Sequence, residues 1–237
     1  MTLKEDNTIV QDVRRYLVSH SELYGDELYT GDINVMPSMA AAPQSLETYR
    51  EQIENCTQCA LSRTRRHFVF GSGQASANLM LIGEAPGEEE DRKGKPFVGK
   101  AGQLLDKILE SIAFQRNEVF IGNILKCRPP GNRDPQPDEI EHCLPYLINQ
   151  IKIIQPAIIL ALGRIAAQTL LESTVSLGQM RGKIHPFGNA SLIVTYHPAA
   201  LLRNPQWKRA TWEDMQMLRK HYDKTVGDKP KWNPPKR

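Results

Sequence analysis

The sequence predicts an α/β fold in which a parallel β-sheet is covered by helices on both faces. Short apolar runs alternate along the chain with longer segments whose apolar residues recur at helical spacing. The short runs are apolar throughout rather than at every second position, which is typical of parallel strands buried on both faces. The expected strands are residues 78–83, 118–125, 157–162 and 191–196. The expected helices that alternate with them are residues 101–112, 137–154, 163–173 and 207–222.

Glycine and proline residues set the boundaries of these elements. The strand AIILAL is flanked by Pro156 and Gly163, and the strand NLMLIG ends at a glycine. In the helix after the second strand, Pro137 is tolerated in the first turn, whereas Pro145 is expected to bend the helix.

The chain divides into three parts. Residues 1–44 contain three Lys or Arg and seven Asp or Glu residues, a net charge of −4, and they combine an amphipathic helix at 8–24 with a Pro-containing linker. We expect this segment to be a mobile acidic tether, or alternatively a helix that binds a protein partner. Residues 45–222 form the folded domain, which begins with a short helix capped by Ser45. Residues 223–237 are polar, basic and rich in proline, and are expected to be disordered.

The folded part of the chain is basic. The whole chain has a formal net charge of +3, so the residues after the acidic segment carry +7. This excess suggests a polyanionic partner such as nucleic acid, although ordinary solubilising charge would give the same value. No apolar run reaches membrane-spanning length, and the N-terminus lacks the pattern of a secretory signal. We therefore expect a cytoplasmic protein with no membrane partner, and we take it to be a monomer.

Polar side chains lie where three of the expected strands end. The first strand leads into EAPGEEED, which contains the carboxylates Glu84, Glu88–Glu90 and Asp91. Asn123 lies near the end of the second strand, and His197 follows the fourth. Because ligands of open α/β sheets bind beyond the carboxyl ends of the strands, we expect these side chains to form one site.

Each of these residues also has a purely structural interpretation. The acids after Gly87 are typical of a solvated turn, and Phe97 can anchor the core rather than stack on a base. A single His at a strand end, such as His197, is more often a hydrogen-bonding residue than a catalytic one. Arg203 and Lys208 fit phosphate contacts, but they also fit a solvated helix face.

The four cysteines form two pairs. Cys56 and Cys59 form a C-x-x-C motif, while Cys127 and Cys143 have fifteen residues between them. In a reducing compartment such thiols are more often metal ligands than disulfides, and both zinc and an iron–sulfur cluster suit four of them. On spacing alone zinc is the commoner metal, and Cys143, within a helix, can instead be a core thiol. Because the pairs lie far apart in sequence, a metal would join the start of the domain to its middle, a structural role.

Together, these motifs resemble the family 4 uracil-DNA glycosylases, the iron–sulfur branch of that superfamily. The resemblance is carried by GEAPGEEED, GKPFVGKAGQLLD, NILKCRPPGNRDP, VTYHPAALLRNP and the cysteine spacing, over about residues 45–222. It implies a three-layer α/β/α sandwich around a four-stranded parallel sheet, with residues 1–44 as an N-terminal helical and linker appendage. It also implies a DNA repair enzyme that hydrolyses the N-glycosidic bond of uracil in DNA, releasing free uracil and leaving an abasic site.

The resemblance also assigns the cofactor and the pocket. It implies a 4Fe–4S cluster rather than zinc, with the ligands Cys56, Cys59, Cys127 and Cys143. The residues implied to line the uracil pocket are Gly83, Glu84, Ala85, Glu90, Phe97, Asn123 and His197. Phe97 would stack on the base, and the amide of Asn123 would pair with O4 and N3–H of uracil, an arrangement that cytosine presents in reverse. Glu90 would reject the thymine methyl group sterically, and His197 would hydrogen-bond uracil O2 and stabilise the leaving anion.

One departure from the superfamily pattern concerns the attacking water. The best-known branch has a water-activating Asp in a GQDPYH motif, and the aligned residue here is Ala85. Another group must therefore position the water. Glu84 is our preferred catalytic residue, and Glu90 is the second candidate.

The expected substrate is uracil-containing DNA, whose target base must be flipped out or met on a single strand. Leu201, Leu202 and Arg203 are expected to enter the DNA at the flipped base, and Lys208 is expected to contact phosphates. The alternative function is a relative that binds uracil-DNA without turnover, or a polymerase-associated DNA-binding protein. The motifs GEAPG and CRPPGNRDP argue against covalent capture, because they lack a capture-type His loop. A structural zinc module ranks third.

Overall fold

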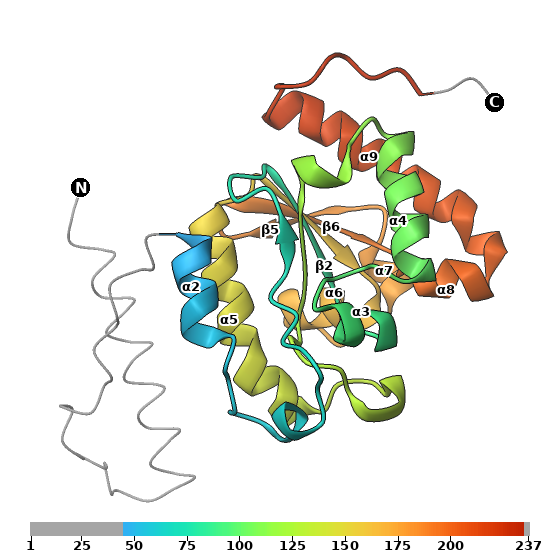
Figure 1. Cartoon of the computed structure of the whole chain (residues 1–237). Coiled ribbons are helices and arrows are strands. Elements are labelled where there is room, and N and C mark those ends of the chain that lie inside the picture. Colours follow the sequence, from blue (N-terminus) through green and yellow to red (C-terminus); the bar gives the residue numbers. More distant parts are fainter. Residues whose placement is uncertain (1–44, 235–237) are drawn as a thin grey trace, which may run out of the picture. The chain divides into compact units, whose positions relative to one another are not determined.

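The structure, a computed structural model, describes residues 45–234; the expectations for residues 1–44 lie outside this range. In the described part of the chain one sheet contains six strands in the order β1-β3-β2-β4-β6-β5 (Figure 1). The strands are β1 (Ser72–Gly73), β2 (Leu79–Gly83), β3 (Phe120–Asn123), β4 (Ile158–Leu162), β5 (Ile184–Phe187) and β6 (Ala190–Thr195). The four middle strands are parallel, and β1 and β5 are antiparallel strands at the two edges. The α/β class is therefore confirmed. The sequence predicted the four parallel strands, but it did not predict the two short antiparallel strands at the edges of the sheet.

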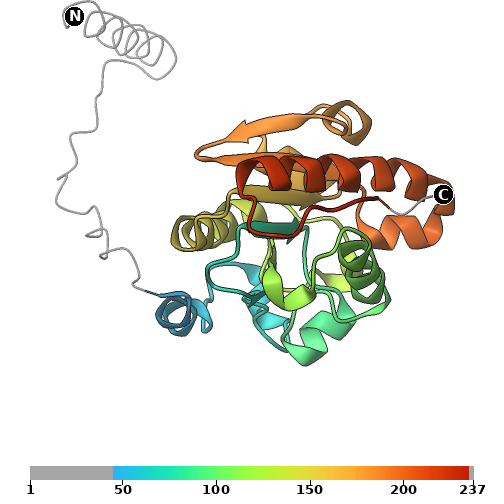
Figure 2. The same cartoon turned by 90° about the horizontal axis from the view of Figure 1, so that it is seen from above.

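Helices cover both faces of this sheet (Figures 1 and 2). One face packs against α2 (Leu46–Ile53), α5 (Pro137–Ile154), α6 (Arg164–Leu170) and α7 (Leu177–Met180). The other face packs against α4 (Lys100–Ser111) and α9 (Lys208–Thr225). Met80 belongs to the first apolar layer and its neighbour Leu81 to the second, because successive strand residues point to opposite faces. This arrangement explains why the strands are apolar at every position.

Two further short helices lie beyond the carboxyl ends of the strands. They are α3 (Glu88–Lys93), which follows β2, and α8 (Pro198–Arg203), which follows β6. Single 3₁₀ turns occur at Ala60–Arg63, Arg116–Glu118, Pro130–Asn132 and Pro205–Trp207. The residues of α3 were expected to form an acidic turn, so the helix is a difference from the sequence prediction. Helix α5 begins with a capping box and continues through Pro145 to its expected end.

The C-terminal segment 223–237, expected to be disordered, is described as far as residue 234. Helix α9 continues to Thr225, and Trp232 packs against the apolar layer that contains α9. Arg219 Nη2 donates a hydrogen bond to the carbonyl oxygen of Pro230 over 2.7 Å, and Tyr222 Oη donates to Asp228 over 3.1 Å. These contacts hold a segment whose composition alone suggests disorder. Within residues 45–234, none of the helices is long and apolar enough to cross a membrane.

Candidate functional site

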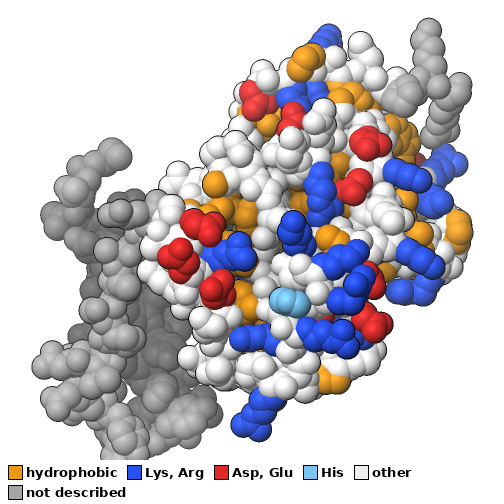
Figure 3. Space-filling view, viewed as in Figure 1, with side chains coloured by type: hydrophobic (Ala, Val, Ile, Leu, Met, Phe, Trp, Pro, Cys, Tyr) orange, Lys and Arg blue, Asp and Glu red, His pale blue; other side chains and the backbone are white. Residues whose placement is uncertain are grey.

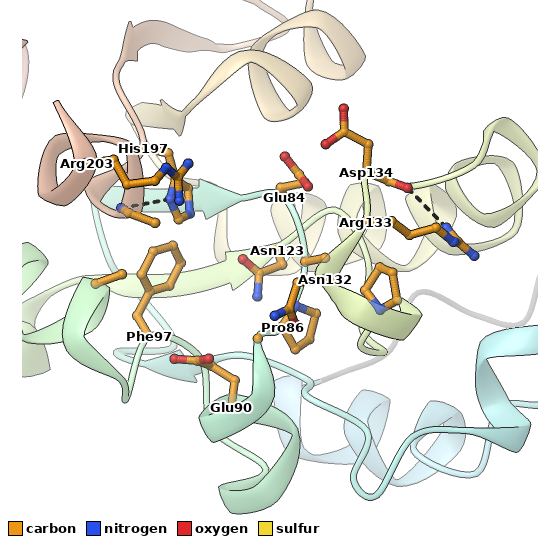
Figure 4. Close-up of a pocket in the computed structure, with 15 residues that line it drawn as sticks. Glu84, Pro86, Glu90, Phe97, Asn123, Asn132, Arg133, Asp134, His197 and Arg203 are labelled. Carbon is orange, nitrogen blue, oxygen red and sulfur yellow. Dashed lines mark hydrogen bonds between the residues drawn. The ribbon is translucent and has the colours of Figure 1, made fainter.

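A pocket of about 370 Å³ opens at the carboxyl ends of β2, β3 and β6 (Figure 4). The loop after β2 contributes Glu84 and Ala85, the end of β3 contributes Asn123, and His197 lies just beyond the end of β6. The three strands are parallel; β3 is next to β2, and only β4 lies between β2 and β6. Their carboxyl ends therefore bring together residues that are more than a hundred positions apart in the sequence. The pocket is also lined by Glu90, Phe97, Pro129, Asn132, Arg133, Asp134 and Arg203.

Asn123 provides an acceptor that the protein itself leaves unused. Its side chain is 1% exposed, and within residues 45–234 its Oδ1 atom has no hydrogen-bond partner. A buried polar atom without a partner costs about 1–3 kcal/mol. Because Asn123 lines the pocket, this unpaired acceptor is a candidate to receive a hydrogen bond from a ligand.

Phe97 forms the wall opposite this amide. Its ring is buried and lies 5.4 Å from the ring of His197, centroid to centroid. Gly83 lies beneath both walls: a Cβ atom at this position would be 2.5 Å from Asn123 Oδ1 and 2.7 Å from Phe97 Cζ. Gly83 is not among the residues that line the pocket surface; the absence of a Cβ atom at this position leaves the space that Asn123 and Phe97 occupy.

His197 is held in one tautomer. The backbone N–H of Ala199 donates a hydrogen bond to His197 Nδ1 over 3.1 Å, as part of the N-cap of α8. Nδ1 is therefore an acceptor, and in the neutral ring the proton is on Nε2. Although part of the ring borders the pocket, burial and, to a smaller extent, the nearby charge of Arg203 lower the pKa of His197 to about 4, while Glu90 opposes the shift. The ring is thus a neutral Nε2–H donor near pH 7.

The two expected catalytic carboxylates have different surroundings. Glu90 Oε1 accepts hydrogen bonds from the backbone N–H groups of Val98 over 2.8 Å and Gly99 over 3.0 Å. Glu84 has no such side-chain partner among the described residues. Burial, followed by the charge of Asp134, raises the pKa of Glu84, and Arg164 partly offsets the increase. Of the two, Glu84 is the carboxylate with the greater freedom to contact a ligand or a water molecule.

Comparison with known proteins agrees with this geometry. Residues 70–216 match the family described as the uracil DNA glycosylase superfamily. The type-4 uracil-DNA glycosylase of Pyrobaculum aerophilum is 44% identical over 181 residues, covering 73% of this chain and 92% of the relative. The type-4 enzyme of Archaeoglobus fulgidus is 41% identical over 184 residues, covering 74% of this chain and 92% of the relative. That of Sulfurisphaera tokodaii is 44% identical over 184 residues, with coverages of 74% and 84%.

This chain belongs to the type-4 family of the uracil-DNA glycosylase superfamily. Its expected family membership, inferred from the strand-end motifs and the cysteine spacing, is confirmed.

The four cysteines of this uracil-DNA glycosylase come from three segments that meet on one side of the sheet. Cys56 and Cys59 lie in the loop after α2, Cys127 follows β3, and Cys143 is in α5. Cys127 and Cys143 are buried, and burial raises the pKa of the Cys143 thiol to about 12, with smaller contributions from Cys127 and Cys59. Within residues 45–234, no three His, Cys, Asp or Glu side chains converge closely enough to coordinate one metal ion.

Hydrogen-bond donors point at three of the sulfur atoms. Arg65 Nη1 donates to Cys127 Sγ over 3.3 Å, and Tyr146 Oη donates to Cys56 Sγ over 3.2 Å. The backbone N–H of Lys126 donates to Cys143 Sγ over 3.2 Å. Donors of this kind surround metal-bound thiolates and tune them. Arg65 and Tyr146 were not predicted from the sequence, because their approach to the sulfur atoms depends on tertiary packing.

One face of the domain is rich in basic side chains (Figure 3). Figure 3 shows Lys and Arg side chains spread over the middle and right of one face, with a group of acidic side chains at its left. Arg203 and Lys208 are exposed, and Arg203 reaches the pocket wall. Leu202 is 48% exposed, whereas Leu201 is only 1% exposed. The expectation that Leu201 enters DNA is therefore wrong, because this side chain is already buried in the domain.

The loop Pro129–Asp134 forms a pocket wall that the site prediction omitted. Its residues Asn132, Arg133 and Asp134 line the pocket, and Arg164 Nη2 of α6 donates to Asp134 Oδ2 over 2.7 Å. The motif NILKCRPPGNRDP contained this loop, so a signal was present in the sequence. The sequence did not indicate, however, that this loop lies beside the residues that follow β2.

Proposed function

We propose that this chain excises uracil from DNA by hydrolysing the N-glycosidic bond, leaving an abasic site. The observation that carries the proposal is the buried, unpartnered Oδ1 atom of Asn123, a residue that lines the same pocket as Phe97 and the neutral His197. The pocket suits a flat, uncharged base that offers an N–H beside a carbonyl group.

Uracil satisfies the amide of Asn123 completely. N3–H would donate to Oδ1, and O4 would accept from Nδ2, while Phe97 stacks against the ring. Cytosine has an unprotonated N3 beside an amino group, so it would leave Oδ1 facing an acceptor and Nδ2 facing a donor. Because unpaired buried groups discriminate strongly, one amide can distinguish the two bases.

His197 would act on the leaving group. As the glycosidic bond breaks, negative charge develops on uracil O2 and positive charge on the sugar. The Nε2–H of the neutral ring is available to donate to O2, because Nδ1 is occupied by the N–H of Ala199. This hydrogen bond strengthens as charge develops, which is the condition for lowering the barrier.

Glu84 would act on the other side of the breaking bond. Its raised pKa and its position on the pocket wall suit a carboxylate that stabilises the cationic sugar and orients water. Glu90 is less suited to that task, because Oε1 already accepts two backbone hydrogen bonds. We therefore assign the catalytic carboxylate role to Glu84.

The DNA would be held on the basic surface around the pocket. Leu202 is an exposed apolar side chain beside the pocket and would fill the space left by the flipped nucleotide. Arg203 and Lys208 are exposed and would contact phosphates.

The test is release of free uracil from oligonucleotides that contain one uracil, as single strands and as duplexes, with cytosine and thymine substrates as controls. We expect uracil release alone, with an abasic product. Tight binding of uracil-DNA without release would instead identify a non-turnover binding protein.

We also propose that Cys56, Cys59, Cys127 and Cys143 hold a 4Fe–4S cluster. Four cysteine thiolates are the ligand set that such a cluster takes, and three of the four belong to, or pack against, the same apolar layer. The donors from Arg65, Tyr146 and Lys126 fit thiolates whose charge must be balanced. The cluster would have a structural role, because it would connect the loop after α2 with the segment after β3 and with α5.

Metal analysis of anaerobically purified protein tests this assignment. We expect about four irons per chain and broad absorbance of the iron–sulfur type. Cys127→Ala should lose iron and thermal stability together. Stoichiometric zinc with no iron, in protein from cells supplied with iron, would contradict it.

A further inference from the structure

The turn between α3 and α4 holds Phe97 in a backbone conformation that this residue disfavours. Phe97 has a φ of 50°, in the left-handed region where a residue with a bulky side chain is a genuine outlier. Neither neighbour in sequence imposes this value. Contacts from outside the turn must therefore maintain it.

Glu90 supplies the contact at the C-terminal side of the turn. Its Oε1 atom accepts the N–H of Val98 over 2.8 Å and the N–H of Gly99 over 3.0 Å, the two amides that directly follow Phe97. Gly99 is the N-cap of α4 and has no side chain with which to cap the helix. The carboxylate of Glu90, from α3, thus binds the amides at the start of α4, where negative charge is favourable.

Two glycines restrict the turn from other directions. A Cβ atom on Gly102 would be 1.9 Å from the carbonyl oxygen of Phe97, so α4 itself packs directly against the turn. A Cβ atom on Gly87, the N-cap of α3, would be 2.8 Å from Glu90 Oε2, so the second carboxylate oxygen fills the space beside that glycine. Both Glu90 and Phe97 are therefore held closely, and the ring of Phe97 lies against the ring of His197 at the pocket wall, with 5.4 Å between the ring centroids (Figure 4).

We propose that Glu90 is a positioning residue that acts through Phe97. By binding the amides of Val98 and Gly99, it sets the stacking ring at its place before a base enters the pocket. This inference rests on the proposed uracil excision, and it differs from a role of Glu90 as a steric barrier to the thymine methyl group or as an acid or base. It explains why one carboxylate oxygen of Glu90, a residue that lines the pocket, binds two backbone amides.

Two substitutions of Glu90 separate these roles. Glu90→Gln keeps an acceptor oxygen but removes the charge, whereas Glu90→Ala removes the acceptor. We expect single-turnover uracil release to fall about tenfold or less in Glu90→Gln and at least a hundredfold in Glu90→Ala. The control is Glu89→Ala, in the same helix, whose carboxylate binds Arg92 and Lys93 at the surface; its rate should be unchanged. Equal losses in Glu90→Gln and Glu90→Ala would show that an acceptor for the two amides does not account for the role of Glu90, and would overturn the proposal.

A double-mutant cycle tests whether Glu90 acts through Phe97. If it does, Glu90→Ala combined with Phe97→Ala should be no slower than Phe97→Ala alone, within about threefold, because the ring to be positioned is already missing. Losses that multiply would assign Glu90 an independent role. Normal uracil release with new thymine release in Glu90→Ala would identify a steric barrier instead.

Amide hydrogen exchange of the full chain provides a measurement that does not require activity. In Glu90→Ala, the amides of Val98 and Gly99 should exchange at least tenfold faster than in the wild type, while amides of β4 remain protected. In Glu89→Ala, neither amide should change. Unchanged protection of both amides in Glu90→Ala would refute the positioning role, whether or not the wild-type protein releases uracil. Absence of uracil release by the wild type would refute only the proposed function.

Discussion

Burial of His197 should make the folded protein less stable as the pH falls from 6.5 toward 4. The pKa of this ring is lowered from 6.5 to about 4, first by burial and then by the charge of Arg203. In the unfolded chain the ring titrates near its ordinary value, so between these two pH values the unfolded state binds a proton that the folded state excludes. The free energy of unfolding therefore decreases as the pH decreases through this interval, and the contribution is constant above pH 6.5.

The size of the effect follows from the pKa of the ring in the folded and unfolded states. At pH 5 the ring is almost fully protonated in the unfolded chain and mostly neutral in the folded domain. The resulting loss is about 2 kcal/mol relative to pH 7.5, because each decrease of one in pH below 6.5 costs about 1.4 kcal/mol. Other groups also titrate in this range, so the quantity to compare is the difference between the wild type and a variant that cannot gain the proton.

The assay is denaturant unfolding of the wild type and of His197→Gln at pH 7.5, 6 and 5. We expect the wild type to lose about 2 kcal/mol more than the variant between pH 7.5 and pH 5. His142→Gln, which changes an exposed ring on α5, should follow the wild type. Parallel curves for wild type and His197→Gln would refute the reasoning, as would an NMR titration that places the pKa of folded His197 near 6.5.

Three further predictions concern the pocket and its surface. Asn123→Asp should slow single-turnover uracil release by roughly four orders of magnitude, because O4 of uracil would face a carboxylate; unchanged release in a folded variant would exclude Asn123 as the base reader. Gly83→Ala should abolish release while the circular dichroism spectrum is kept, since its Cβ atom would be 2.5 Å from Asn123 Oδ1 and 2.7 Å from a ring carbon of Phe97. Leu201→Ala should lower the free energy of unfolding by about 2–5 kcal/mol, whereas Leu202→Ala should leave stability unchanged and slow excision from duplex DNA; the reverse pattern would exchange the two roles.

The sheet and its site could be predicted because both depend on simple rules. Residues such as Met80 and Leu81 are apolar in succession, as a strand buried on both faces requires. Once the strands are known to be parallel, their carboxyl ends must lie together. The placement of Asn123 and His197 on one pocket then follows without any knowledge of the helices between them.

Helix α3 was missed although its signals are present in the sequence. Its first turn is acidic, its last turn contains Arg92 and Lys93, and it ends at Gly94 in the left-handed conformation. These features favour a helix through its dipole and its C-cap. A helix of six residues contains too few apolar positions for periodicity to reveal it, so the acids suggested a solvated turn instead.

The distinction between Leu201 and Leu202 could not come from local sequence. Both belong to the short helix α8, and its sequence PAALLR gives no reason to bury one leucine rather than the other. The packing of α8 against α4 determines which leucine is buried, and this packing depends on the tertiary structure. The edge strand β1 has two residues, Ser72 and Gly73, and its pairing with β3 likewise has no local signal.

Glu84 and Glu90, two of the five acidic residues of GEAPGEEED, show how one motif can serve two purposes. Glu90 is on a helix that places its Oε1 atom between two backbone amides, and a carboxylate with two such donors is an anchor. Glu84 precedes that helix, in the loop directly after β2, where burial raises its pKa and the described residues give it no side-chain hydrogen bond. A cationic sugar in a basic DNA-binding surface needs a nearby negative charge that is not already neutralised by donors. The spacing of the two acids along the chain therefore separates the group that sets the geometry of the pocket from the group that can respond to charge within it.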